Sequence, residues 1–269
     1  MSYPLVSIIM GVYNEERTIS NCINSILKQT YSNWELIVCD DCSEDKTREI
    51  LEDYSLKDSR IVILKNVVNM GLAASLNRCL ERSKGTYIAR MDADDESLPN
   101  RIEMQVLFLE SHPQIDCVGC NRMIFDEHGD VGVRKSVEYP TKEILRKNTP
   151  FAHPTIMMKK SVYDRLGGYT ISKETMRAED LDLWIRFYSH NYVGYNLQEV
   201  LYRYRESLND LKKRNLKAAI GTAKVYRRGY KALGFHAIVN IYALKPIIAA
   251  IIPNVIMKSY YKRNLRIRK

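Results

Sequence analysis

Two aspartates one residue apart, Asp92 and Asp94, have the spacing of a cation-binding pair. The apolar run before them, residues 87–91, is typical of a buried strand, so both carboxylates fall where a strand opens into a loop. Hard cations such as Mg²⁺ are commonly held by one or two carboxylates together with substrate phosphates. The alternative is a solvated acidic turn that caps the helix following Pro99. The pair alone does not decide between these two interpretations.

The elements around this pair predict where other polar groups lie. Apolar, β-branched runs predict strands at residues 6–10, 34–39, 60–64 and 87–91, with helices between them starting near residues 19, 43 and 71. This alternation predicts an α/β fold with a mostly parallel, doubly wound sheet, in which ligands bind at the carboxyl ends of the strands. Five polar residues fall at such ends: Asn14, Asp40, Asp41, Asp92 and Asp94. We therefore expect one binding site at this edge.

The pattern changes after residue 110. Strands are predicted at residues 117–119, 122–125 and 155–158, and Gly167 and Gly168 end a short helix. An amphipathic helix over residues 181–187 then carries Glu179 and Asp180 in its first turn. Acids are favoured at helix N-termini by the helix dipole, which explains why an acid is there but not what it does.

The cysteines raise the question of a metal site of another kind. Cys39 with Cys42, and Cys117 with Cys120, have C-x-x-C spacing. We reject zinc, because the first pair would share its turn with two aspartates and strand alternation points Cys39 into the core. Free thiols, and an N-terminus that lacks the features of a signal peptide, predict a cytoplasmic protein.

Charge is distributed unevenly along the 269 residues. Residues 1–202 hold 24 Lys+Arg and 30 Asp+Glu, a net charge of −6. Residues 203–269 hold 17 Lys+Arg and 2 Asp+Glu, a net charge of +15, and the two parts together give the chain's +9. Such asymmetry indicates an anionic surface as partner.

Five stretches, taken in order, resemble the family 2 inverting glycosyltransferases, which have the nucleotide-sugar-binding GT-A fold. They are residues 6–15 (first strand and its Asn-Glu turn), 36–43 (second strand and Asp-Asp-Cys-Ser), 69–72 (Asn-Met-Gly-Leu), 87–95 (fourth strand and Asp-Ala-Asp-Asp) and 178–184 (Ala-Glu-Asp-Leu-Asp-Leu-Trp). Each stretch is weak alone, and their common order and rough spacing make the set specific. The resemblance covers about residues 5–205.

The resemblance implies a role for each motif residue. Asp92 and Asp94 would hold Mn²⁺ or Mg²⁺ against the donor diphosphate, Asp41 would accept a hydrogen bond from uracil, and Asp180 would be the general base. Glu179 is the alternative base. The remaining donor-binding positions would be Val12, Asn14, Glu15, Asn69, Gly71, Arg90, Ala93 and Arg205, with Asp92 among them. A single displacement would convert an α-linked donor into a β-linked product.

Several positions depart from the family pattern. Gly11 stands where proline is common and Cys42 where glycine is common. Arg205 belongs to a late Tyr-Arg element that is not followed by the histidine often found there. The Q-x-x-R-W signature of processive synthases is absent, which favours one sugar per event. His153 stays outside the predicted catalytic set, because a structural hydrogen bond explains a loop histidine equally well.

The C-terminal part predicts a second unit. We expect a GT-A domain over residues 1–206, with a nucleotide-binding half at about 1–110 and an acceptor half at about 111–206, followed by a basic amphipathic helical tail at 207–269. Residues 235–257 approach the roughly 20 apolar residues that span a bilayer. Lys245, Pro246 and Pro253 interrupt them, which favours a helix lying in the interface. The prediction is peripheral attachment to the cytoplasmic face of the bacterial inner membrane; a soluble helical subdomain or a dimer interface is the alternative.

These observations predict an enzyme that moves one sugar from a UDP-sugar to a hydroxyl of a saccharide acceptor, linked to polyprenyl diphosphate, in the synthesis of a bacterial surface polysaccharide. A sugar-phosphate nucleotidyltransferase is the alternative enzyme class, but it would need a Gly-rich, Arg-containing loop after its first strand. Residues 11–16, Gly-Val-Tyr-Asn-Glu-Glu, are not such a loop. A non-enzymatic protein that binds anionic surfaces would explain the basic tail, but the tail holds no recognisable nucleic-acid-binding module, so we expect no nucleic acid as partner. A dehydrogenase is excluded because no G-x-G-x-x-G follows the first strand.

Overall fold

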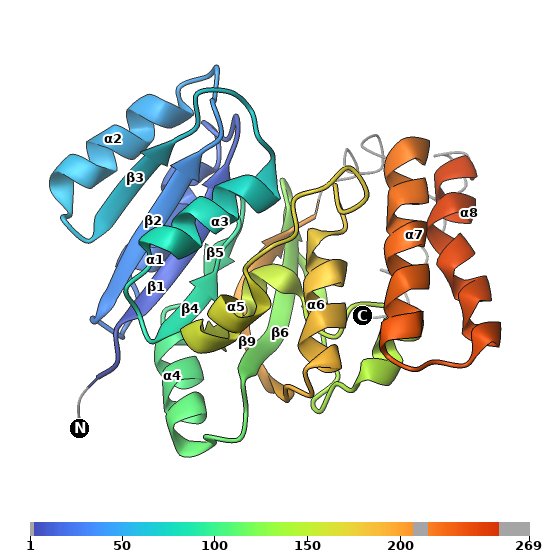
Figure 1. Cartoon of the computed structure of the whole chain (residues 1–269). Coiled ribbons are helices and arrows are strands. Elements are labelled where there is room, and N and C mark those ends of the chain that lie inside the picture. Colours follow the sequence, from blue (N-terminus) through green and yellow to red (C-terminus); the bar gives the residue numbers. More distant parts are fainter. Residues whose placement is uncertain (1–2, 207–214, 253–269) are drawn as a thin grey trace.

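The computed structural model describes residues 3–206 and 215–252. One sheet of nine strands forms its centre (Figure 1). The strands are β1 (Val6–Val12), β2 (Trp34–Asp40), β3 (Ile61–Lys65), β4 (Tyr87–Arg90), β5 (Glu96–Ser97), β6 (Cys117–Asp126), β7 (Gly129–Arg134), β8 (Met157–Lys159) and β9 (Gly194–Arg205). The strand order is β3-β2-β1-β4-β8-β6-β9-β5, with β7 paired to β6.

The helices lie on both faces of this sheet and at one end of it (Figure 1). They are α1 (Ile19–Leu27), α2 (Thr47–Lys57), α3 (Leu72–Arg82), α4 (Arg101–Ser111), α5 (Lys160–Leu166), α6 (Glu179–Ser189), α7 (Leu216–Ala232) and α8 (Lys245–Ile251), with 3-10 helices η1 (Lys142–Arg146), η2 (His153–Thr155) and η4 (Ala237–Leu244).

The α/β prediction is confirmed, with a clear division within the sheet. Strands β3, β2, β1 and β4 are parallel, as the strand–helix alternation predicts. Beyond β4 the sheet is mixed: β8 is antiparallel to both β4 and β6, whereas β6 and β9 are parallel. The predicted strands at 117–119 and 122–125 prove to be one strand, β6. Its register with β9 shifts around Asn121, which explains the break in the sequence pattern.

Burial on both faces explains why the first strand is a continuous apolar run. Ile8 and Met10 pack in the core formed with α1 and α4, whereas Ile9 faces the core formed with α3, α5 and α6. The carboxyl ends of β1, β2 and β4 consequently meet at one edge, and the loops that follow them hold the polar residues singled out above.

Helix α7 packs closely on α6, to the right of the sheet in Figure 1. Val225, Tyr226 and Tyr230 are buried in the same core as α6. A Cβ at Gly229 would come within 2.3 Å of Ile185 Cδ1, so the glycine permits this close approach. Helix α7, which belongs to the predicted tail, thus contributes buried side chains to the predicted acceptor half. The division into a 1–206 domain and a 207–269 tail stays a prediction.

The apolar run of residues 235–257 does not form one long helix where the structure describes it. It divides into η4 and α8 at Lys245, the first interruption noted in the sequence, and residues 253–257 lie outside the described part. Within residues 3–206 and 215–252, every helix is too short or too polar to cross a bilayer.

Candidate active site

Three carboxylates follow β4 and face one another. Asp92, Asp94 and Asp95 each place an oxygen within 4.8 Å of the others. Asp95 was not in the predicted metal set, although it is the third acid of the same motif. It is only 1% exposed, and its Oδ2 has no hydrogen-bond partner among the described residues, while its Oδ1 accepts from the Arg205 N–H at 2.7 Å. Of the residues described, this trio alone has the grouping of acidic, cysteine or histidine side chains that holds a metal.

The electrostatics of the trio fit a divalent cation. Burial, with the charges of Asp92 and Glu15, raises the pKa of Asp94 to about 7. Burial, with the charges of Asp92 and Asp94, also raises the pKa of Asp95 well above its ordinary value. Crowded, desolvated carboxylates of this kind are stabilised by a cation between them, and an all-oxygen donor set suits Mg²⁺ or Mn²⁺. Cys39 is buried as predicted, and the six cysteines are free thiols.

Two arginines hold the acidic loop in place. Arg90 is buried at the end of β4, and its Nη1 pairs with the Asp92 carboxylate. Arg205, at the end of β9, donates from Nε to the Asp94 carbonyl at 3.1 Å and stacks over Phe125, with 4.6 Å between the guanidinium carbon and the ring centroid. The structure thus brings Arg90 and Arg205 to the predicted metal residues from two strands that are distant in the sequence.

Asp41 fixes the loop that leads into α3. Its Oδ1 accepts from the Met70 N–H at 2.8 Å and from Asn66 Nδ2 at 2.6 Å, and its Oδ2 accepts from the Gly71 N–H at 2.8 Å. Gly71 has φ +87°, which few other residues adopt. Since a carboxylate has about four acceptor positions, this arrangement leaves about one for a ligand. Asn69, next to Met70, is exposed.

The loops after β1 and β2 are cross-linked beside Asp41. The Val12 carbonyl accepts from the Asp41 N–H at 2.8 Å, and Asn14 Oδ1 accepts from the Glu44 N–H at 2.8 Å. The Glu15 N–H donates to Thr47 Oγ1 at 2.7 Å. These bonds place the predicted donor-binding residues of both loops on one rim. Ala93 lies buried between Asp92 and Asp94.

A cleft of about 480 Å³ extends from Asp92, just after β4, to the start of α6. Asp180 lines it together with Arg90 and Asp92, and Glu179 lies beside Asp180. The remaining lining residues are Leu72, Arg122, Thr149, Phe151, Ala152, His153, Pro154, Arg177 and Tyr204. Burial raises the pKa of Asp180. The hydrogen bond that the Leu181 N–H donates to Asp180 Oδ1, at 2.7 Å, opposes that rise in pKa.

The three acids in the first turn of α6 differ in their partners. Burial and the charge of Asp180 raise the pKa of Glu179. Asp182 instead accepts from Thr170 Oγ1 at 2.6 Å and Arg186 Nε at 2.8 Å, and from Arg228 Nη2 of α7 at 3.0 Å. Asp182 therefore anchors α6 to α7, and Asp180 and Glu179 are the acids that face the cleft.

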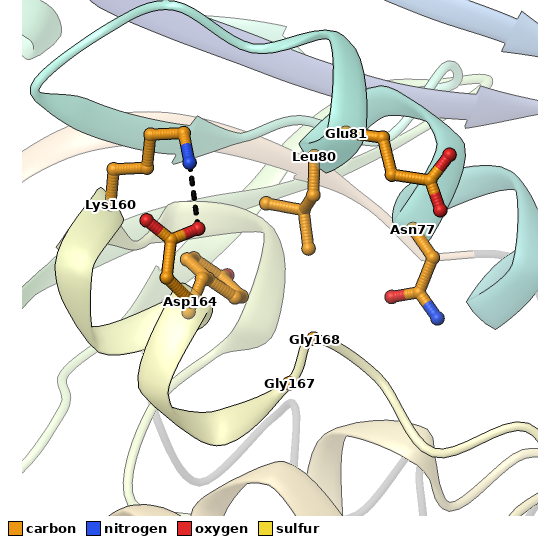
Figure 2. Close-up of a pocket in the computed structure, with 8 residues that line it drawn as sticks. Asn77, Leu80, Glu81, Lys160, Asp164, Gly167 and Gly168 are labelled. Atoms are coloured by element: carbon orange, nitrogen blue, oxygen red, sulfur yellow. Dashed lines mark hydrogen bonds and ion pairs between the residues drawn. The ribbon is translucent and has the colours of Figure 1, made fainter.

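A second hollow, of about 300 Å³, lies between α3 and α5 (Figure 2). Lys160 donates to Asp164 at 2.6 Å, and Asn77, Leu80 and Glu81 of α3 line the other side of the hollow. The chain turns there through Gly167 and Gly168, both at positive φ. This hollow includes none of the residues at the carboxyl ends of β1, β2 and β4, so it is separate from the candidate active site.

Known proteins are similar to this chain in sequence. Residues 7–167 match the family model described as glycosyl transferase family 2. The chain is 45% identical to Bacillus subtilis EpsE, named as a glycosyltransferase, over 100% of this chain and 97% of that protein. It is 34% identical to the Escherichia coli UDP-Glc:alpha-D-GlcNAc-diphosphoundecaprenol beta-1,3-glucosyltransferase WfgD, over 79% of this chain and 81% of that one.

Solved structures show the same fold at low identity. S. aureus TarS 1–349 in complex with UDP has a TM-score of 0.64 and 22% identity, over 85% of this chain and 69% of that one. The mannosyltransferase PcManGT from Pyrobaculum calidifontis, in complex with GDP-Man and Mn²⁺, has a TM-score of 0.65 and 20% identity, over 97% of this chain and 80% of that one.

Proposed function

This chain belongs to glycosyl transferase family 2, and from that premise we propose that it moves one sugar from a UDP-sugar to a hydroxyl of a polyprenyl-diphosphate-linked saccharide, in the synthesis of a bacterial surface polysaccharide. The observation that carries the proposal is the cleft that Asp180 shares with Arg90 and Asp92. One cavity there offers a base for the acceptor beside acids and an arginine suited to a metal-bound diphosphate.

The proposed reaction is a single displacement. The acceptor hydroxyl gives its proton to the Asp180 carboxylate while its oxygen attacks the anomeric carbon, and the bond from that carbon to the diphosphate breaks on the opposite face. A divalent cation held by Asp92, Asp94 and Asp95 would offset the negative charge that develops on the departing nucleoside diphosphate. Attack from the opposite face inverts the anomeric centre.

The donor nucleotide is tied to Asp41. The fold alone does not identify the nucleobase of the donor, because the TarS complex holds UDP and the PcManGT complex holds GDP-Man. Asp41 is buried with its carboxylate mostly occupied by backbone N–H groups, which suits a single remaining hydrogen bond from an imide N–H of uracil. The first experiment is a screen of UDP-, GDP- and CDP-sugars for thermal stabilisation and for metal-dependent hydrolysis.

We expect UDP to compete for the donor site at least roughly tenfold better than GDP or CDP. Cytosine has no hydrogen at N3 to donate to the remaining Asp41 acceptor position, and guanine places its N–H groups on a larger, two-ring base. Asp41→Asn should reduce the difference in affinity between UDP and the other two nucleotides. Competition is measured by calorimetry against the donor that the screen identifies. Equal binding of all three nucleotides would remove Asp41 from its assigned role.

Membrane attachment is the part of the proposal that rests on η4 and α8. Ile238 and Ile241 of η4 are 76% and 66% exposed, and Ile248 and Ile251 of α8 are 56% and 69% exposed. Val239 and Ala243 face inward, which turns this apolar surface away from the core. The nearby helix α7 carries exposed cations, Lys224, Arg227 and Lys231. Apolar side chains flanked by cations suit peripheral contact with an anionic leaflet, which for an enzyme using cytoplasmic nucleotide sugars is the cytoplasmic one.

Replacing both Ile241 and Ile248 by Ser should reduce binding of the full-length protein to phosphatidylglycerol vesicles at least roughly tenfold, because each Ile loses apolar surface that the membrane would bury. Flotation of the protein with vesicles measures this. Leu56→Ser is the matched control, since Leu56 of α2 is 88% exposed and lies outside the proposed surface. Binding should also weaken at high salt. Equal flotation of all variants would favour a packed subdomain or a dimer.

A further inference from the structure

His153 is a buried residue of the cleft with one unused nitrogen. It begins η2, is 8% exposed and packs edge-on against Trp184, with 5.6 Å between ring centroids. Its Nε2 lies 2.8 Å from the Tyr169 hydroxyl. Its Nδ1 has no hydrogen-bond partner within the described ranges 3–206 and 215–252. Buried polar atoms are normally paired, so a partner for Nδ1 is expected from outside the protein.

The neighbouring hydroxyls decide which nitrogen carries the hydrogen. Tyr163 Oη lies 3.1 Å from Tyr169 Oη, and both rings are buried. A hydrogen on Nε2 of His153 would be donated to Tyr169, whose own hydrogen would go to Tyr163. The Tyr163 hydrogen and the Nδ1 lone pair would then both lack a partner among the described residues. The opposite order, from Tyr163 to Tyr169 to Nε2, pairs every hydroxyl hydrogen and puts the imidazole hydrogen on Nδ1. Only Nδ1–H then lacks a partner among the described residues.

The ring is also held neutral. Burial and the charge of Arg90 lower the pKa of His153 well below its ordinary value. A neutral N–H matches an uncharged oxygen, such as a sugar hydroxyl, while Arg90 supplies positive charge for a phosphate oxygen. The same segment contributes Phe151 and Pro154 to the cleft, and such apolar groups suit the C–H face of a sugar ring.

We propose that Nδ1–H of His153 donates a hydrogen bond to a hydroxyl oxygen of the acceptor saccharide and so orients that sugar toward Asp180. His153 is then an acceptor-binding residue, not the base. This assignment rests on the proposed function, because it needs a saccharide acceptor in the cleft that Asp180 lines. A contact with the donor diphosphate is the competing assignment, and the kinetics below separate the two.

The kinetic test uses two substitutions that keep different nitrogens. The Asn side chain places its amide near the position of Nδ1, whereas Gln reaches the position of Nε2. His153→Gln should raise KM for the acceptor saccharide by roughly tenfold, the loss of one hydrogen bond, while His153→Asn should stay within roughly threefold of the wild type. KM for the UDP-sugar, and its slow hydrolysis without acceptor, should be unchanged in both. Equal losses in the two variants, or a rise in KM for the donor, would overturn the proposal.

A spectroscopic test needs no substrate. Long-range ¹H–¹⁵N spectra of the full-length protein, labelled at histidine, distinguish the two neutral tautomers and the cation, and loss of one signal in His153→Asn assigns His153. We expect the Nδ1–H tautomer at pH 7, and a shift toward Nε2–H in Tyr169→Phe, which cannot donate to the ring. An Nε2–H tautomer or a cationic ring in the wild type would refute the hydrogen-bond order. Failure of the proposed function is distinguishable, because it would appear as absence of UDP-sugar turnover in the wild type whatever the tautomer.

Discussion

Asp180→Asn should lower the rate of sugar transfer by roughly 10²–10⁴-fold and leave the affinity for the UDP-sugar nearly unchanged. The reason is local: Asn has the same size and can still accept the Leu181 N–H at its Oδ1, so the start of α6 is preserved. What is lost is the group that takes the proton from the acceptor hydroxyl. Steady-state transfer rates and the dissociation constant of the UDP-sugar measure the two quantities separately.

The neighbouring acids provide matched controls. Glu179→Gln should cause a milder loss, because Glu179 faces the cleft without being the assigned base. Asp182→Asn should act on stability, lowering the melting temperature, since Asp182 anchors Arg186 and Arg228. If Glu179→Gln is inactive and Asp180→Asn is near normal, the base is Glu179. If neither substitution affects transfer, the single-displacement mechanism is wrong.

The meeting of Asp41, Asp92 and Asp94 at one edge of the sheet was predictable because periodicity and sheet geometry act together. Strand–helix alternation fixes β1, β2 and β4 as parallel neighbours, and residues at their carboxyl ends must then meet. The structure accordingly places Asp41, Asp92 and Asp94 around one edge. The burial of Asp95 was not predictable from the motif, because it depends on Arg205, which belongs to the last strand of the sheet.

The contribution of β9 and α7 could not be derived from local patterns. Strand β9 enters the sheet beside β6, more than seventy residues away in the sequence, and supplies Tyr202, whose hydroxyl accepts from the Asp92 N–H at 3.3 Å. The excess of Lys and Arg from residue 203 onward predicts a basic C-terminal segment that is separate from the preceding domain. Yet Gly221 and Gly229 let α7 approach Glu174 and Ile185 closely, and Arg228 pairs with Asp182. Small residues carry no hydrophobic signal, so the sequence pattern hides this packing.

The second large effect is expected at the acidic trio. Asp94→Asn should reduce transfer by roughly 10³-fold, because it removes one charged oxygen from the proposed cation site, and a bound metal contributes several kcal/mol of charge stabilisation. The fold should persist: three carboxylates within 4.8 Å repel one another, so the metal-free variant should melt no lower than the wild type. Added Mn²⁺ should raise the melting temperature of the wild type and not that of the variant.

A remote acid is the control for this experiment. Asp53→Asn changes the same side chain on the exposed face of α2, where Asp53 pairs with Lys57, so both transfer and the Mn²⁺-dependent stabilisation should match the wild type. Excess EDTA should abolish transfer by the wild type, and added Mn²⁺ or Mg²⁺ should restore it. Full activity of the purified enzyme in EDTA would refute a metal requirement, and the trio would then be an acidic loop ordered by Arg90 and Arg205 alone. Mn²⁺-dependent stabilisation that survives Asp94→Asn would move the cation to other ligands.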